Sequence, residues 1–233
     1  SFSLHSQMFS LIVLFGFAAV AAQQCSNAKM SDADRSTIVE QHNRLRSELA
    51  FGRAKTVDGG FAPSGKNIYK MTWDCGLEDR SQQWADRCTF AHSSSNFRQG
   101  AGENIYQFST TGRIPSTEDL VVDAGRAWWA ELAEYGISNA DNILTREVFN
   151  EGVGHFTQMA WGPTTKIGCG IATNCGKKGR NVIIVVCQYL EAGNYIDEPI
   201  YELGKPCMND IECTTFKNST CSAADGLCIK PEH

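Results

Sequence analysis

Residues 182–189 read VIIVVCQY, and the first six of these side chains are all apolar. A strand with one face in water alternates apolar and polar residues, whereas a continuous apolar run indicates a strand that is covered on both faces. Residues 166–173 form a second predicted strand, and the turn-rich stretch NCGKKGRN (174–181) between the two favours a hairpin. The sequence therefore predicts an antiparallel pair of strands with other elements packed on each side.

Three helices are predicted before this hairpin, because apolar residues recur there at the spacing of one helical face. They cover residues 31–52, 74–88 and 116–135. Each begins near a residue that can cap a helix, and the first and third end at a glycine. Helices followed by an antiparallel pair imply an α+β fold in which the sheet is sandwiched between helices.

The N-terminal residues have the character of a secretory signal. Residues 8–22 read MFSLIVLFGFAAVAA, a run without charge that ends in small side chains. The run is too short for a membrane span, which takes about 20 apolar residues, but it fits the apolar core and cleavage site of a signal peptide. We expect residues 1–22 to be a signal peptide, with Met8 as the natural start and cleavage after Ala22; a buried helix is the alternative. No later segment approaches a membrane span, so the sequence predicts a secreted, extracellular protein.

The chain has ten cysteines, all of them after Ala22. An even count of this size is typical of exported, disulfide-bonded proteins and is rare in the cytosol. Zinc is the alternative explanation for clustered cysteines, but the sequence has no C-x-x-C pair of the kind that zinc ribbons use. We therefore expect five disulfides among Cys25, Cys75, Cys88, Cys169, Cys175, Cys187, Cys207, Cys213, Cys221 and Cys228.

Residues 201–233 differ in character from the rest of the chain. Four of the cysteines lie there, while large apolar residues are too few for a separate core. We expect a small cysteine-rich extension whose four cysteines pair with one another. The preferred pairings are Cys207–Cys221 and Cys213–Cys228.

The charge of the chain bears on its partners, and one local motif bears on its modification. The formal net charge is −5 and there is no run rich in lysine or arginine, so a nucleic-acid partner is not expected. Asn218-Ser219-Thr220 is a glycosylation sequon, which is usable only if the chain is exported.

Glu131 occupies an unexpected place in the third predicted helix. On a helical wheel, this residue falls in the middle of the apolar stripe. The stripe consists of Leu120, Ala124, Ala127, Trp128 and Tyr135. A buried carboxylate is costly unless it is paired, hydrogen-bonded or bound to a metal, so we expect Glu131 to face inward and to meet partners from elsewhere in the chain. The alternative is a side chain at the helix edge that reaches out to solvent.

Two histidines and one further glutamate are candidate partners. His92 follows the second predicted helix, His155 lies in the stretch GVGHFTQMAW (152–161), and Glu103 lies in GENI (102–105). Two histidines and two glutamates can build a zinc site or an acid–base site. None of them belongs to an H-E-x-x-H motif, so residue types alone favour structural hydrogen bonds over a metal.

Four motifs in order along the chain resemble those of the CAP superfamily, which comprises cysteine-rich secretory proteins, antigen 5 and pathogenesis-related 1 proteins. They are HNRLR (42–46), GENI (102–105), GHFTQMAW (154–161), and VCQY (186–189) with GNY (193–195). The layout is most similar to the activation-associated, venom-allergen-like secreted proteins of parasitic nematodes. Glu191 stands where the family commonly has proline, which leaves the shape of that turn open.

The resemblance implies a three-layer α-β-α sandwich, the CAP domain, over residues 23–200. It also implies a central cleft lined by a tetrad of two histidines and two glutamates, which here are His92, Glu103, Glu131 and His155. Some members resemble zinc binders that use the two histidines. We therefore expect His92 and His155 to hold Zn²⁺ or another divalent metal, while Glu103 and Glu131 orient the two rings or hold a metal-bound water.

Three functions compete. The preferred one is a non-catalytic secreted effector that binds a host or other extracellular partner through the cleft. The second is a metal-assisted hydrolase that uses the tetrad; a serine mechanism through residues 93–95 lacks the G-x-S-x-G motif. The third is a carrier of sterols or other lipids, for which residues 106–115 offer a flexible wall, although an ordinary connecting loop is the simpler interpretation. The sequence assigns no residue a catalytic role.

Overall fold

The computed structural model describes residues 25–26, 29–177 and 179–232. The predicted signal peptide, with Met8 and Ala22, lies outside these residues. A four-stranded sheet in the order β2-β4-β5-β3 runs through the described part. Its strands are β2 (Thr72–Trp73), β4 (Lys166–Ala172), β5 (Asn181–Leu190) and β3 (Gly102–Thr110). β4 and β5 pair antiparallel, which confirms the predicted hairpin.

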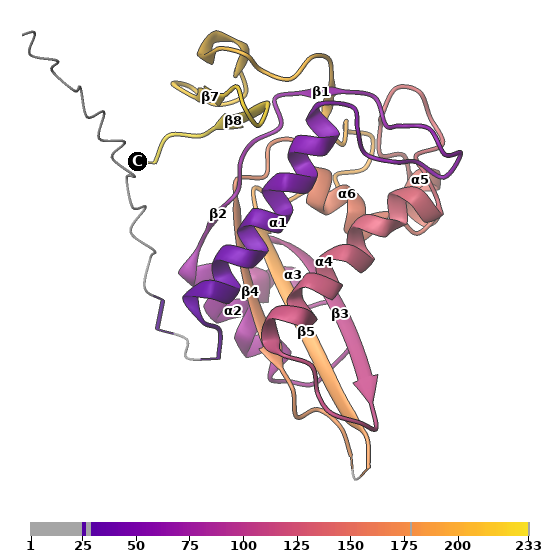
Figure 1. The fold of residues 1–233 in the computed structure, drawn as a ribbon, viewed down its shortest axis with the longest axis vertical. Coiled ribbons are helices and arrows are strands. Elements are labelled where there is room, and N and C mark those ends of the chain that lie inside the picture. Colours follow the sequence, from indigo (N-terminus) through magenta and orange to yellow (C-terminus); the bar gives the residue numbers. More distant parts are fainter. Residues whose placement is uncertain (1–24, 27–28, 178, 233) are drawn as a thin grey trace, which may run out of the picture.

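Both faces of β5 are covered, as its continuous apolar run predicts. Ile183 and Val185 on one face join a core cluster with residues of α1 (Asp32–Ala50) and α4 (Thr117–Glu134). Ile184 and Val186 on the other face pack with residues of α2 (Cys75–Ala85). The chain therefore forms the expected α+β, three-layer α-β-α sandwich, with α1 and α4 crossing the same face of the sheet (Figure 1).

The three predicted helices are confirmed, and each begins at a side-chain cap. Ser31 caps α1, Asp74 caps α2 and Ser116 caps α4, each by accepting a hydrogen bond from a backbone N–H in the first turn. Glycines let α2 approach the sheet closely. A Cβ on Gly168 or Gly170 of β4 would collide with the backbone of α2, so larger side chains there would push the helix away.

Several elements were not predicted from the sequence. They include the two-residue strand β2, β3 and the short helices α3 (Ser95–Arg98), α5 (Arg146–Asn150) and α6 (Gly154–Ala160), besides the small strands described below. The prediction that residues 106–115 form a loop was wrong for 106–110, which belong to β3 and pair with β5 along its length. Polar residues fill much of β3, because it is an edge strand, and its pattern is therefore weak.

Every cysteine is paired, which confirms the expectation of five disulfides. They join Cys25–Cys75, Cys88–Cys175, Cys169–Cys187, Cys207–Cys221 and Cys213–Cys228. The last two are the pairings that the sequence favoured for the extension. The prediction that its four cysteines bond with one another is confirmed.

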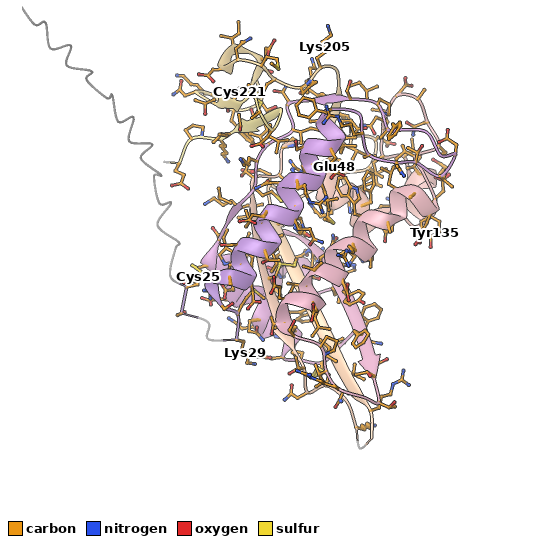
Figure 2. All side chains as sticks on the ribbon, in the orientation of Figure 1. Cys25, Lys29, Glu48, Tyr135, Lys205 and Cys221 are labelled. Carbon is orange, nitrogen blue, oxygen red and sulfur yellow. A yellow bond between two sulfur atoms is a disulfide. The ribbon has the colours of Figure 1, made fainter. Side chains whose placement is uncertain are left out.

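The extension is built from short pieces that pack against the sandwich. They are β6 (Glu202–Leu203), which pairs with β1 (Gly65–Lys66), the 3-10 helix η1 (Asp210–Glu212), β7 (Thr220–Ser222) and β8 (Leu227–Ile229). Tyr69 is fully buried against three of the extension's half-cystines. Ser47 near the C-terminal end of α1 donates a hydrogen bond to the carbonyl of Asp225 in the extension (2.7 Å). Figure 2 labels the neighbouring Glu48 on this end of the helix and Cys221 in the extension.

The turn that departs from the family pattern also contacts the extension. The Leu190–Glu191 peptide is cis. The carboxylate of Glu191 lies 2.5 Å from Nζ of Lys230 and accepts a hydrogen bond from the hydroxyl of Thr165 (2.9 Å). Glu191 therefore links the sandwich to the end of the extension. Among the described residues, no helix has the length and apolar character that a membrane span requires.

Candidate functional site

The first pair of the tetrad consists of His92 and Glu103. His92 lies in the loop between α2 and α3, and Glu103 lies on β3. Nδ1 of His92 is 3.0 Å from Oε1 of Glu103. The glutamate side chain is 1% exposed and the histidine side chain is 60% exposed. An imidazole at the surface is therefore paired with a buried carboxylate.

Glu103 is held by four hydrogen bonds. Besides the ring of His92, it accepts the backbone N–H of Ser93 (2.8 Å), the hydroxyl of Ser93 (2.7 Å) and the side-chain amide of Gln188 (3.1 Å). Burial by itself would raise the pKa of Glu103, but the hydrogen bonds from His92, Ser93 and Gln188 outweigh it and hold the pKa below the ordinary value. Glu103 is therefore an ionised acceptor at neutral pH.

The second pair consists of Glu131 on α4 and His155, the second residue of α6. Oε1 of Glu131 is 2.5 Å from Nδ1 of His155, while Oε2 accepts the backbone N–H groups of His155 and Phe156, both at 2.9 Å. The side chain of Glu131 is 13% exposed, which confirms the inward orientation that the helical wheel predicts.

Glu131 also caps the N-terminal end of α6, although it belongs to another helix. Val153 precedes α6 and has no side-chain oxygen to cap it. The carboxylate of Glu131 supplies the missing acceptor from a neighbouring helix, and its negative charge suits the N-terminal end of the helix dipole. One side chain therefore fixes both the helix that carries His155 and the ring of His155.

Polar contacts join the two pairs across β3 and α6. Asn104, next to Glu103, donates from its side-chain amide to the carbonyl of His155 (3.1 Å). The Oε1 atom of Gln158 on α6 lies against Gly102 of β3, where a Cβ would collide with it. The ring of His155 also stacks on Trp128, with ring centroids 6.1 Å apart.

The structure brings each histidine to its own glutamate, but it does not gather the tetrad into one compact cluster. Within the described residues, no three members of the tetrad offer ligand atoms that all lie within 4.8 Å of one another. The two groups that meet this criterion contain cysteines whose sulfurs are in disulfides, so they offer no thiolate for a metal.

The hydrogen bonds decide which ring nitrogens remain for a ligand. In both pairs the carboxylate contacts Nδ1, so Nε2 is the atom left to face a ligand. A carboxylate that accepts a hydrogen bond from one imidazole nitrogen is the usual support for a histidine that binds a metal through the other. Each histidine therefore leaves Nε2 as the ring nitrogen that could take a metal ion or another ligand.

Several residues of the site were not identified from the sequence. Gln188 lies opposite Glu103 in the sheet register, and this could be found only once β3 was known. Ser93 was noted for a serine mechanism, but it is 3% exposed and its hydroxyl donates to Glu103. Ser94 caps α3. These two serines therefore serve as hydrogen-bond partners within the structure.

A buried polar pair connects α1 to this region. Nδ1 of His42 is 2.8 Å from the carbonyl of Ile38, and Nε2 is 3.1 Å from the hydroxyl of Tyr189, which also lies 3.4 Å from the amide of Asn104. Burial lowers the pKa of His42 to about 4, so its ring is neutral at neutral pH. His42, in the HNRLR motif (42–46) of α1, thus reaches the site through Tyr189 and Asn104 and does not line it.

Comparison with protein families gives a match over most of the sandwich. The family model described as "CAP: Cysteine-rich secretory protein family" matches residues 39–189. Ancylostoma secreted protein of Ancylostoma caninum is 37% identical over 213 residues, which cover 90% of this chain and 47% of that protein. The chain thus spans about half the length of that relative. Venom allergen 3 of Solenopsis invicta is 34% identical, over 77% of this chain and 76% of its own length.

Solved structures agree with these matches. The structure of BmVAL-1 is 44% identical, with a TM-score of 0.80 and coverage of 90% of this chain and all of the other. The crystal structure of NaASP2 with Zn²⁺ is 38% identical, with a TM-score of 0.76 and coverage of 88% of this chain and 100% of the other. A protein of the same fold has therefore been crystallised with zinc.

Proposed function

Because the chain belongs to the cysteine-rich secretory protein (CAP) family, we propose that it is an exported effector that acts by binding a host or other extracellular partner. In this proposal the tetrad is a binding centre and not a catalytic one. His92 and His155 hold a divalent metal, with zinc as the first candidate, and Glu103 and Glu131 keep the two rings in place.

The observation that carries this proposal is how the two carboxylates are used. Glu103 accepts four hydrogen bonds and Glu131 accepts three, all from groups of the protein itself. A general base must accept a proton from water or substrate, and its lone pairs must be open to that molecule. Carboxylates that are engaged in this way are suited to orienting histidines, which favours binding over hydrolysis.

A bound metal would give the tetrad a Lewis-acid centre that can accept an oxygen or nitrogen donor from a partner. The two imidazole Nε2 atoms are its ligands in this proposal. NaASP2, whose structure is described with Zn²⁺, supports the choice of metal because it shares this fold. The proposal specifies the partner only by its chemistry: it is a molecule that presents an oxygen or nitrogen donor to the metal.

Two observations support export, which an extracellular effector requires. The named relatives include a secreted protein and venom allergens, and five disulfides suit an oxidising compartment. We propose that residues 1–22 are removed as a signal peptide, that residues 23–200 form the CAP domain, and that residues 201–233 form its extension. Asn218 is exposed, so export would make it accessible for glycosylation.

A turnover assay tests the effector against the hydrolase. The zinc-loaded secreted protein and a His92→Ala/His155→Ala variant are offered the same panels of esters and peptides. The proposal expects equal background rates for the two proteins. Hydrolysis that depends on zinc and is lost in the double variant would contradict it and would favour the metal-assisted hydrolase.

A further inference from the structure

One groove of the molecule is lined in part by residues of the extension. Its volume is about 450 Å³, and its lining includes Trp161, Tyr195 and Tyr201 together with two acidic residues, Glu198 and Glu202. None of the described residues that line it is basic. We call it the aromatic groove. It combines apolar ring surfaces with negative charge, and it contains no member of the tetrad.

The walls of the aromatic groove are fixed by hydrogen bonds. The carbonyl of Glu198 accepts from the backbone N–H of Leu144 (2.9 Å), and the carbonyl of Ile200 accepts from that of Gly162 (2.8 Å). The hydroxyl of Tyr201 donates to the carbonyl of Pro63 (2.9 Å). A groove with walls held in this way needs little ordering when a ligand enters, which favours affinity.

Two of the rings meet at an angle. The centroids of Trp161 and Tyr195 are 6.1 Å apart, and their planes are tilted by 57°. Trp161 is almost buried, whereas Tyr195 is 57% exposed. The faces of aromatic rings carry partial negative charge and attract cations that come within about 6 Å of the ring centre. The two tilted rings can therefore attract a positively charged group by cation–π interaction.

The two carboxylates differ in how far their charge is compensated. Glu202 lies 3.2 Å from Nζ of Lys66 and accepts a hydrogen bond from the amide of Asn67 (2.9 Å). Glu198 is exposed, and within the described part of the chain no ion pair involves its side chain. Its charge is thus available to a ligand and attracts a cation to the groove that Glu198 and the rings line.

We propose that the aromatic groove binds an organic cation, a quaternary or protonated amine, against the rings of Trp161 and Tyr195 with Glu198 as its counter-ion. Two sources present this chemistry. One is a small free amine such as choline, and the other is the amine of a lysine side chain on a partner protein. The uncompensated charge of Glu198 disfavours an anionic ligand, and a neutral ligand would gain nothing from that charge.

Calorimetric titration of the full disulfide-bonded chain tests this proposal with three probes. They are choline, its neutral isostere 3,3-dimethylbutan-1-ol, and Nα-acetyl-lysine N-methylamide as a model of the side chain. At least one of the two cations should bind in the millimolar range, and the neutral alcohol should bind at least about fivefold more weakly than choline if choline is the ligand. The tighter cation identifies the source.

Two substitutions locate the binding. Tyr195→Leu and Glu198→Gln should each weaken the better cation by about fivefold or more, since each removes one of the attractive groups. Tyr135→Leu is the matched control, because Tyr135 is another half-exposed tyrosine at the end of α4 and outside the groove (Figure 2). Unchanged thermal midpoints show that the variants fold.

Three results would overturn the proposal. The first is no binding of either cation at about 20 mM, which exceeds the range expected for such a site. The second, where choline is the tighter of the two cations, is equal binding of choline and the neutral alcohol. The third is equal loss of affinity in the Tyr135→Leu control, which would place the cation elsewhere on the surface.

Discussion

Glu131 and His155 are 24 residues apart in the chain, yet Oε1 of the glutamate lies 2.5 Å from Nδ1 of the histidine. The other oxygen of Glu131 holds the backbone of the helix that carries this histidine. The same carboxylate thus stabilises the fold and orients a ring of the candidate site. Its loss should affect both, and the two effects can be measured separately.

Replacing Glu131 tests its part in stability. Glu131→Ala should lower the free energy of unfolding by about 2–4 kcal/mol, because two backbone N–H groups and a ring N–H lose their acceptor at a largely buried place. Glu131→Gln should cost less, since it keeps one side-chain oxygen. Guanidinium chloride unfolding with the disulfides intact measures both. Glu134→Ala, at an exposed position one turn later in α4, is the control. Equal stability of Glu131→Ala and the control would contradict the prediction.

His42 should make stability depend on pH. Its pKa is about 4 in the folded protein, because burial disfavours the charged ring, and about 6.5 in the unfolded chain. The unfolded chain then binds the proton more readily between these values, so the contribution of His42 is complete above pH 6.5 and is lost as pH falls towards 4. The expected loss over this interval is about 3 kcal/mol.

A His42→Gln variant isolates this contribution, since glutamine does not titrate. The difference in unfolding free energy between wild type and variant should shrink as the pH is lowered from 6.5 to 4. Glu103, whose pKa lies below the ordinary value of 4.5, keeps its contribution above about pH 4.5 and loses it as the pH falls further. Parallel pH profiles for the two proteins would show that His42 is not the responsible group.

Arg46 should tolerate even lysine poorly. It is fully buried and donates to five backbone carbonyls. These belong to Tyr69, Met159, Trp161, Gly162 and Thr164. Burial lowers its pKa to about 9, so it is still charged at neutral pH. Lysine has three donors, so Arg46→Lys leaves carbonyls unpaired and should cost about 2–6 kcal/mol.

Arg44→Lys provides the comparison for Arg46→Lys. Arg44 is on the same helix and exposed, with one ion pair to Glu48, so its replacement should change stability by less than about 0.5 kcal/mol. Urea unfolding of both variants measures the difference. Similar costs at the two positions would mean that the carbonyl cage around Arg46 contributes little.

Long buried elements could be predicted from the sequence, and short or edge elements could not. The apolar run of β5 and the helical spacing in α1, α2 and α4 repeat over several turns or residue pairs, so the pattern is strong. β3 mixes polar and apolar residues at the sheet edge, and α6 has no capping side chain at its start. Neither carries a signal that sequence spacing can detect.

The same distinction holds in the candidate site. The helical wheel predicted that Glu131 faces inward, because α4 is long and its apolar stripe is clear. It could not say that His155 is the partner, since that depends on where α6 packs. Gln188 became a partner of Glu103 only through the register between β5 and β3. Tertiary packing, which local patterns do not encode, makes these contacts.

Zinc titration followed by calorimetry tests the central claim most directly. The wild type should bind one zinc ion, and His92→Ala/His155→Ala should lose this binding while keeping five disulfides by intact mass. Glu103→Gln and Glu131→Gln should keep the ligands but weaken affinity by about 10–100-fold, because the groups that orient a metal-binding histidine typically contribute that much. Zinc binding of equal affinity in the wild type and the double histidine variant would contradict the account.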